Sequence, residues 1–450
     1  MRSHCSNCLF QLLAALVLVG VWPVAAPSQA VTPHSHKVIV ISLDAFAAES
    51  LHDPHLPIPT LRALMKNGAY ARSMQPINPT VTWPNHTAMV TGVNASEHHL
   101  LVNGLIVGQR TDHSPEVNPG ASKAELVAAP TVYDVAHAAA LTIAEVDWVA
   151  VSSANTITWS FAERPDPDGL IPQEMIQQGQ ISHDDLVHFG RPSQAWRDRI
   201  YTQAAIDILH KHHPDLLLLH LLALDSIEHD TGFGNDSGQN TIAFLDDRVK
   251  DIVDVVREEG DLDNTTFLVV SDHGQNSVHK YIHADVLLRQ AGLQAADCKT
   301  KAFSLADGGF ALVYQQHATP ASVVAMKKLF EGKPGIRAAL TPAEAAKDGW
   351  PTPEQSNQAS NLLLYAENDY SFRGDAAGTI FVTEGMKSGN HGYPNTEPRM
   401  QAIFIASGAG IRPVGEIPAF ANVDVAATIA QLLHVQMPGI QGKPLTQILK

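Results

Sequence analysis

The stretch Val38-Ile-Val-Ile-Ser-Leu-Asp44 decides the fold class of this chain, because it is an almost unbroken apolar run that ends in an aspartate. Two further apolar runs also end at an aspartate: Leu216–Leu224 is followed by Asp225, and Phe267–Ser271 is followed by Asp272. Such runs are typical of strands in a parallel sheet that is covered on both faces. Because ligands bind outside the carboxyl ends of strands in open α/β sheets, the three aspartates predict one site at one sheet edge.

Segments of helical character alternate with these runs. This alternation predicts an α/β fold with a mostly parallel central sheet and helices on both faces. Between about residues 288 and 385 the apolar runs are shorter and proline and glycine are frequent, so we expect a small inserted α+β cap there. The main expected helices span Pro59–Gly68, Pro192–His213, Gln239–Gly260 and Asp424–Leu433.

The first thirty residues read as a secretory signal peptide. Leu9–Trp22 is apolar but short for a membrane span, and Ser28-Gln-Ala30 offers small residues at a cleavage site. An uncleaved N-terminal anchor is the alternative. With cleavage, residues 31–450 form an exported catalytic domain, periplasmic or secreted, with no stable membrane anchor. Only Cys298 would remain of the three cysteines, so no internal disulfide is expected.

The charge of the chain limits its partners. The formal net charge is −16 at pH 7, which argues against a surface that binds nucleic acid. Bound divalent cations would offset part of this charge.

Two sets of carboxylates and histidines could each hold a metal ion. Asp44, Asp272 and the adjacent His273 make one set; Asp225, His229 and a distant histidine make the second. The best distant candidate is His391 in Gly389-Asn-His-Gly-Tyr393, since flanking glycines allow a sharp turn. Zinc favours such ligands. The alternatives are an N-cap aspartate followed by an exposed histidine for Asp225 and His229, and a plain loop for Asp272 and His273.

A candidate nucleophile lies in the segment Asn78–Gly92. Thr82 comes just before Pro84, which we expect to occupy the first position of a helix. A helix N-terminus favours anions, and phosphate above all. A threonine hydroxyl becomes a nucleophile only when a base or a metal lowers its pKa. The alternative is that Thr82 caps the helix through its side chain.

These residues resemble a known family, the type I phosphodiesterase/nucleotide pyrophosphatase family of the alkaline phosphatase superfamily. The resemblance covers Lys37 to about Leu445. Thr-x-x-Pro-Asn-His within Pro79–His86 resembles the family's nucleophile loop, and His86 would brace that loop. The metal motifs follow in the family's order: Ser42-Leu-Asp-Ala-Phe46, Asp225-Ser-Ile-Glu-His229, Ser271-Asp-His-Gly274 and Gly389-Asn-His-Gly-Tyr393.

The resemblance implies two zinc ions and assigns residues to each. Asp44, Asp272 and His273 would hold one ion, which would touch Thr82; Asp225, His229 and His391 would hold the other. Asn103 fits the family asparagine that hydrogen-bonds a phosphate oxygen. Trp83, His99 and Glu228 depart from common family residues without removing a ligand.

The expected activity is metal-dependent hydrolysis of phosphodiester or pyrophosphate bonds through a phosphothreonine at Thr82. The substrate would be a small phosphate ester, a nucleotide or another diester. A phosphomonoesterase or phosphonate hydrolase of the same superfamily is the alternative, but few cations are near in sequence: Arg72, Arg110 and Lys123. A non-enzymatic metal- or phosphate-binding protein is disfavoured because no ligand is missing. A sulfatase is disfavoured because its modified Cys/Ser motif does not occur at Thr82.

Overall fold

The computed structural model describes residues 36–374 and 378–450. The predicted signal peptide at residues 1–30 lies outside this part of the chain. Within the described ranges, every helix is too short or too polar to cross a membrane.

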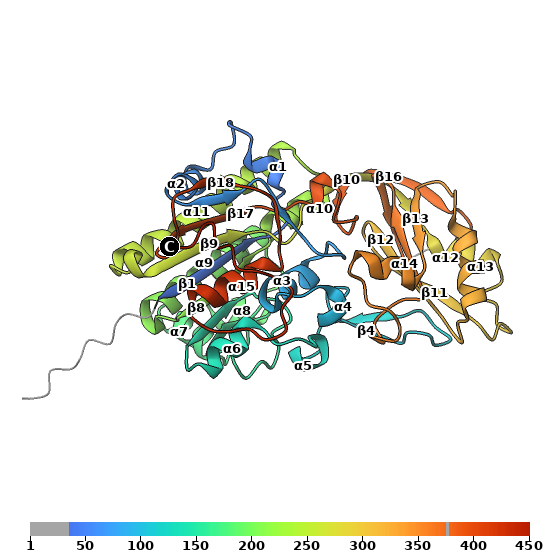
Figure 1. The fold of residues 1–450 in the computed structure, drawn as a ribbon, viewed down its shortest axis with the longest axis horizontal. Helices are drawn as coiled ribbons and strands as arrows, with labels where there is room; N and C mark the ends of the chain where they lie inside the picture. The colour runs from blue at the N-terminus through green and yellow to red at the C-terminus, as the bar shows by residue number, and fades with distance from the viewer. Residues whose placement is uncertain (1–35, 375–377) are drawn as a thin grey trace, which may run out of the picture. The chain divides into compact units, whose positions relative to one another are not determined.

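An eight-stranded sheet forms the centre of the fold (Figure 1). The strands β9, β1, β8, β6 and β7 run parallel to one another, and β17 pairs antiparallel with β9. The predicted fold class, α/β with a mostly parallel central sheet, is therefore confirmed. In spatial order the strands are β18 (Gly415–Ile417), β2 (Ala69–Ala71), β17 (Phe404–Gly408), β9 (Thr265–Val270), β1 (Lys37–Leu43), β8 (Leu216–Leu221), β6 (Ile143–Val146) and β7 (Trp159–Phe161).

Helices cover both faces of this sheet. Alternate side chains of β1 point to opposite faces, so both faces present apolar groups that the helices bury. Ile39, Ile41 and Leu43 pack with the helices of one face, while Val38 and Val40 pack with those of the other. All five side chains are buried. The first face carries α2 (Pro59–Asn67), α7 (Leu170–Gln177), α9 (Gln194–His212) and α11 (Asp236–Glu258); the second carries α3 (Thr82–Thr91), α6 (Val132–Ala138) and α15 (Asp424–Leu432).

The pairing register brings two of the aspartates to the same edge. Ser42 of β1 lies opposite His220 of β8 and Val270 of β9, so Asp44 and Asp272 both emerge two residues further on. The position of Asp225 differs from the prediction, which placed this residue at the end of a strand. The strand β8 ends at Leu221, and Asp225 lies in the first turn of the following helix, α10 (Ala223–Thr231).

The physical reason is the side chain of Asp198, which accepts hydrogen bonds from the backbone N–H groups of Leu222, at 3.2 Å, and Ala223, at 2.7 Å. This carboxylate satisfies donors at the start of α10 and so begins the helix before Asp225.

The helix α3 also begins earlier than predicted, at Thr82 rather than at Pro84. Its first backbone hydrogen bond runs from Asn85 N to Val81 O, at 3.2 Å. Pro84 is tolerated at the third position because N–H groups of the first turn have no partner inside the helix. The residue at the N-cap is Val81, so Thr82 is not the capping residue that the alternative interpretation required.

A second, α+β region follows the β9 strand. It contains a four-stranded sheet in the order β11 (Ala302–Asp307), β12 (Phe310–Gln315), β14 (Leu362–Ala366), β13 (Ile336–Leu340). The helices α12 (Ala284–Gln290) and α13 (Pro320–Phe330) share its core. A three-stranded sheet, β15 (Asp369–Phe372), β10 (Asn276–Ile282) and β16 (Val382–Asn390), leads to His391. The limits of the cap at about 288 and 385 stay a prediction.

Candidate active site

Thr82 lies beside Asp44, Asp272 and His273. The hydroxyl oxygen of Thr82 is 3.3 Å from Nε2 of His273. The same nitrogen is 3.1 Å from Oδ2 of Asp272 and 3.7 Å from Oδ1 of Asp44. All four side chains are buried. One small volume is therefore surrounded by two carboxylates, one imidazole and one hydroxyl.

Two oxygen atoms facing this volume lack partners. Among the described residues, Oδ1 of Asp44 and Oδ2 of Asp272 are buried and accept no hydrogen bond. A buried carboxylate oxygen without a partner is costly. A cation coordinated by both oxygens and by His273 would remove this cost, and the donor set matches the preferences of zinc. The residues present therefore fit a metal ion.

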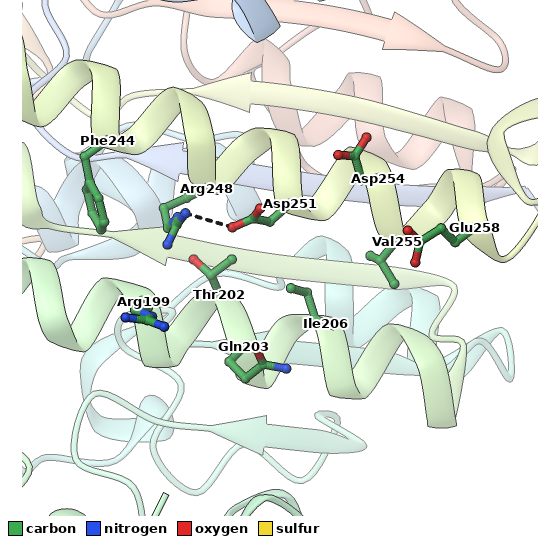
Figure 2. Close-up of a pocket in the computed structure, with 10 residues that line it drawn as sticks. All are labelled: Arg199, Thr202, Gln203, Ile206, Phe244, Arg248, Asp251, Asp254, Val255 and Glu258. Atoms are coloured by element: carbon green, nitrogen blue, oxygen red, sulfur yellow. Dashed lines mark ion pairs between the residues drawn. The ribbon is translucent and has the colours of Figure 1, made fainter. Parts of the chain in front are cut away.

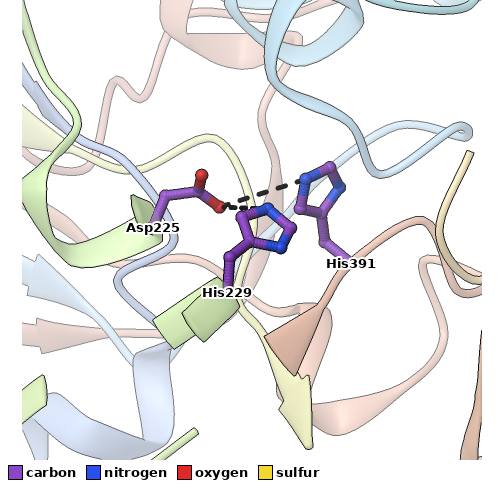
Figure 3. A group of neighbouring side chains, drawn as sticks. All are labelled: Asp225, His229 and His391. Atoms are coloured by element: carbon purple, nitrogen blue, oxygen red, sulfur yellow. Dashed lines mark ion pairs between the residues drawn. The ribbon is translucent and has the colours of Figure 1, made fainter. Parts of the chain in front are cut away.

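A second cluster joins α10 to the segment that follows β16 (Figure 3). Oδ1 of Asp225 lies 3.2 Å from Nε2 of His229 and 4.0 Å from Nε2 of His391. Figure 3 shows both rings turned toward the carboxylate. His229 follows Asp225 by one helical turn, whereas His391 arrives from a distant part of the chain. The three ligand atoms lie within 4.8 Å of one another.

Backbone carbonyl groups orient the three histidines. Nδ1 of His229 donates to Gly389 O at 3.0 Å, Nδ1 of His391 to Thr80 O at 3.2 Å, and Nδ1 of His273 to Gly274 O at 3.1 Å. A histidine that donates through Nδ1 presents the lone pair of Nε2, which is how metal-binding histidines are arranged. In each case Nε2 is the atom that faces the carboxylates.

The two clusters are contiguous. Ligand atoms of Asp44, Asp225 and His273 also lie within 4.8 Å of one another, so Asp225 faces both groups. The carboxylates are close enough to one another to affect each other's pKa. Burial, followed by the charges of Asp272 and Asp225, holds the pKa of Asp44 well above its usual range. Burial also raises the pKa of Asp272. Bound cations would reverse this effect by stabilising the charged carboxylates.

His220 is a buried histidine next to the site that the sequence interpretation missed. Its Nε2 lies 3.0 Å from Oδ2 of Asp44, and its Nδ1 lies 3.1 Å from Asp147 O. It thereby fixes Oδ2 of Asp44, whereas Oδ1 is the oxygen nearer to His273. The signal was present, since His220 is the one polar residue inside the apolar run Leu216–Leu224.

His86 has the bracing position predicted for it. Nδ1 of His86 donates to Thr82 O at 2.8 Å, and Nε2 accepts from the hydroxyl of Ser42 at 2.8 Å. The ring is fully buried and links the first turn of α3 to β1. This contact ties the backbone of the candidate nucleophile to the central strand.

Asn103 is an exposed residue that contacts the residue directly after Thr82. Its Oδ1 accepts a hydrogen bond from the backbone N–H of Trp83 at 2.9 Å. Because the oxygen faces that donor, the NH2 end of the amide is left to donate to a ligand. Asn103 is thus held one residue from Thr82 in an orientation that suits an anion.

A separate groove of about 620 Å³ lies between α9 and α11 (Figure 2). Its lining is of mixed charge and includes the ion pair between Arg248 and Asp251, at 2.9 Å. None of the candidate site residues lines it. We assign no role in the chemistry to this groove.

The fold defines the class of the protein: an alkaline phosphatase-like α/β protein, with clusters of carboxylates and histidines that could hold metal ions at the carboxyl edge of its sheet. The sequence model of the type I phosphodiesterase / nucleotide pyrophosphatase family matches residues 38–394. The chain belongs to this family, as the sequence motifs predicted.

Curated relatives include animal enzymes. Human ectonucleotide pyrophosphatase/phosphodiesterase family member 1 is 23% identical over 410 residues, which cover 88% of this chain and 40% of that protein. The chain thus spans about two fifths of the length of this relative. Rat family member 7 is 22% identical over 444 residues, covering 96% of this chain and 91% of that protein.

Solved structures of a relative share the fold. Murine ectonucleotide pyrophosphatase / phosphodiesterase 5 superposes with a TM-score of 0.72 at 17% identity, and the match covers 92% of this chain and 100% of that chain. A second structure of the murine protein is an inactive variant in complex with AMP, with the same TM-score.

Proposed function

We propose that this protein hydrolyses phosphodiester or pyrophosphate bonds and that Thr82 is the nucleophile. The observation that carries the proposal is the position of Thr82 at the first turn of α3, 3.3 Å from His273 and beside two carboxylate oxygens that have no hydrogen-bond partner in the described part of the chain. A hydroxyl next to metal ligands at a helix N-terminus suits attack on a phosphate ester. Family membership supports the same reaction class.

The side chains would hold two zinc ions. Asp44, Asp272, His273 and Thr82 would bind one, and the second cluster would bind the other. Bound zinc supplies Lewis acidity, which lowers the pKa of a coordinated hydroxyl and neutralises charge on phosphate oxygens. The second set consists of Asp225, His229 and His391.

The reaction divides into two substitutions at phosphorus. The Oγ1–P bond of Thr82 forms while the bond from phosphorus to the leaving alcohol or phosphate breaks. Attack in line directs the leaving group away from Thr82. Water then breaks the Oγ1–P bond and regenerates the hydroxyl. Asn103 would donate its NH2 group to a non-bridging oxygen in both steps.

The cations nearest to Thr82 and Asn103 in the sequence support a diester over a monoester. A monoester presents an additional charged oxygen, which extra donors would have to bind. Arg72 pairs with Glu416, Arg110 donates to the carbonyl groups of Asn357 and Ala359, and Lys123 pairs with Asp134. Each of these three cationic side chains therefore already binds another group of the protein. A monoesterase or phosphonate hydrolase remains the second candidate.

We further propose that the substrate is a small ester such as a nucleotide and that the protein acts after export, in the periplasm or outside the cell. The complex of the murine relative with AMP supports a nucleotide ligand. The prefix "ecto" in the name of the human relative, an ectonucleotide pyrophosphatase/phosphodiesterase, supports this location.

The test is a comparison of bis(p-nitrophenyl) phosphate with p-nitrophenyl phosphate on zinc-loaded protein. We expect the diester to have the higher kcat/KM and turnover to stop when a chelator removes the metal. Faster hydrolysis of the monoester would favour the second candidate. Turnover that survives removal of all metal would overturn the metal-dependent mechanism.

A further inference from the structure

A cavity of about 440 Å³ lies beside the second cluster of candidate metal ligands. Its lining comes from α10, from the strands β15, β10 and β16, and from Arg373, which directly follows β15. Among the candidate site residues, all of which the structure describes, His229 alone lines it. The cavity is therefore adjacent to the site without containing Thr82 or the first cluster.

Ring contacts show where this cavity lies relative to the candidate nucleophile. The hydroxyl oxygen of Thr82 is 3.3 Å from Nε2 of His273. The rings of His273 and His391 stack with their centres 4.0 Å apart, and the rings of His391 and His229 meet edge to face with their centres 5.1 Å apart. His229 then borders the cavity. The histidines thus stand between Thr82 and the cavity.

In-line attack decides which half of the substrate reaches this cavity. The attacking oxygen and the bond that breaks lie on opposite sides of phosphorus. A phosphate bound at the two clusters, with its phosphorus next to Thr82, would direct its leaving group away from Thr82 and toward His229. The cavity offers space for the leaving group in that direction.

Arg373 presents a cationic group to this cavity. Its guanidinium carbon lies 3.6 Å from the centre of the Tyr281 ring, and the hydroxyl of Tyr281 is 2.9 Å from Oγ of Ser388. The backbone N–H of Arg373 donates to Ile282 O at 2.9 Å. Stacking orients the guanidinium plane and leaves the N–H groups at its edge able to bind an anion.

Lys387 supplies a second cationic group. Its stem packs against Gly232 at the end of α10, where an added Cβ would lie only 2.8 Å from Cε of Lys387. Arg373 and Lys387 are both exposed, and neither forms an ion pair with another residue of the described ranges. The one carboxylate in the lining is that of Asp230. The cations nearest to Thr82 in the sequence, in contrast, each bind another group of the protein.

We propose that this cavity is the leaving-group site, in which Arg373, stacked on Tyr281, and Lys387 select a leaving alcohol or phosphate that carries a further anionic group. The assignment rests on the proposed function, because Thr82 as the nucleophile defines the direction of departure. It deepens that function by naming a substrate class. The site adds no chemical step: the bond from phosphorus to the leaving oxygen breaks as before, and that oxygen keeps the electron pair.

The experiment compares two diesters with the same retained group. Methyl p-nitrophenyl phosphate releases p-nitrophenolate, and methyl m-carboxy-p-nitrophenyl phosphate releases the same ring with an added carboxylate. We expect kcat/KM of zinc-loaded protein to be at least about tenfold higher for the carboxylated ester, since a charge-assisted hydrogen bond contributes about this factor or more. Thymidine triphosphate and p-nitrophenyl thymidylate form a second pair, in which the anionic leaving group is a diphosphate.

The double variant Arg373→Ala/Lys387→Ala should lower both ratios by at least about tenfold, because both unpaired cations of the lining are removed. The matched control is Arg191→Ala, at an exposed arginine that does not line the cavity and forms no ion pair with a described residue, and it should keep both ratios. Each ratio is measured within one variant, so partial misfolding affects both substrates of a pair equally.

The outcomes separate the two proposals. A carboxylate ratio near one in wild-type protein, or either ratio unchanged in the double variant, overturns the leaving-group site while hydrolysis through Thr82 stands. Full turnover of all four substrates by Thr82→Ala overturns the nucleophile and, with it, the argument that directs the leaving group.

Discussion

The hydroxyl oxygen of Thr82 lies 3.3 Å from Nε2 of His273, although 191 positions separate the two residues in the chain. The contact joins the start of α3 to the segment after β9. It places the only hydroxyl among the candidate ligands against the imidazole that also faces Asp44 and Asp272. This position is the reason why we propose Thr82 as the nucleophile.

Thr82→Ala is expected to lower kcat on bis(p-nitrophenyl) phosphate by about a thousandfold or more, because the attacking oxygen is removed. Thr91→Ala is the matched control on the same helix. It removes a buried hydroxyl that donates to Thr87 O at 2.7 Å, which costs about 1 kcal/mol of stability and no chemistry. Full activity of Thr82→Ala would contradict the nucleophile assignment.

His391→Ala should reduce bound zinc from two ions to about one and lower the rate with it, since the second cluster loses one of three ligands. Metal content is measured by elemental analysis after dialysis. The control is His279→Ala, at a half-exposed histidine paired with Asp369, which should retain both ions. Two-zinc occupancy in His391→Ala would remove this residue from the ligand set.

His220→Gln should weaken zinc binding by about 10–100-fold, the usual effect of losing a partner that orients a metal ligand. The reason is the 3.0 Å contact between Nε2 of His220 and Oδ2 of Asp44. Competition with a chromophoric chelator measures the affinity, which a change in activity alone would not show. Unchanged affinity would indicate that Asp44 is oriented by the backbone alone.

Asn103→Asp and Asn103→Ala separate two roles of this side chain. Both variants lose the NH2 donor, and we expect kcat to fall by about a hundredfold in each. Asn103→Asp retains an acceptor for the N–H of Trp83, which Asn103 now binds at 2.9 Å. If Asn103→Asp instead kept full activity, the side chain would serve only to hold Trp83.

His98 should make the apo protein less stable in acid. Burial, followed by the charge of His99, lowers the pKa of His98 from 6.5 to about 3, so the folded state binds this proton less readily than the unfolded state. The stabilisation is therefore complete above pH 6.5 and is lost as the pH falls toward 3. At pH 5 the loss is about 2 kcal/mol for this group.

His98→Asn tests this effect, since the amide oxygen can replace Nδ1 as acceptor for Leu100 N, now at 3.2 Å. Urea unfolding of chelated protein at pH 7.5 and pH 5 gives the two free energies of unfolding. The difference between the two pH values should be about 2 kcal/mol smaller in His98→Asn than in wild type. Equal differences would show that His98 does not titrate in this range.

The sequence determined the fold class and indicated which residues we propose as metal ligands. Unbroken apolar runs such as Val38–Leu43 specify strands buried on both faces, because every side chain must be apolar when both faces are covered. Motif order then indicated the family, which the match over residues 38–394 confirms.

Only the tertiary structure decided how the candidate ligands meet. The short-range pattern could not show that Asp198 starts the helix α10 before Asp225, since that hydrogen bond joins residues 25 positions apart. Nor could it reveal the role of His220, whose partner Asp44 is 176 positions away. Local propensity acts over a few residues, whereas strand pairing and side-chain packing bring distant residues together. The buried oxygens of Asp44 and Asp272, which have no hydrogen-bond partner among the described residues, are a consequence of that packing.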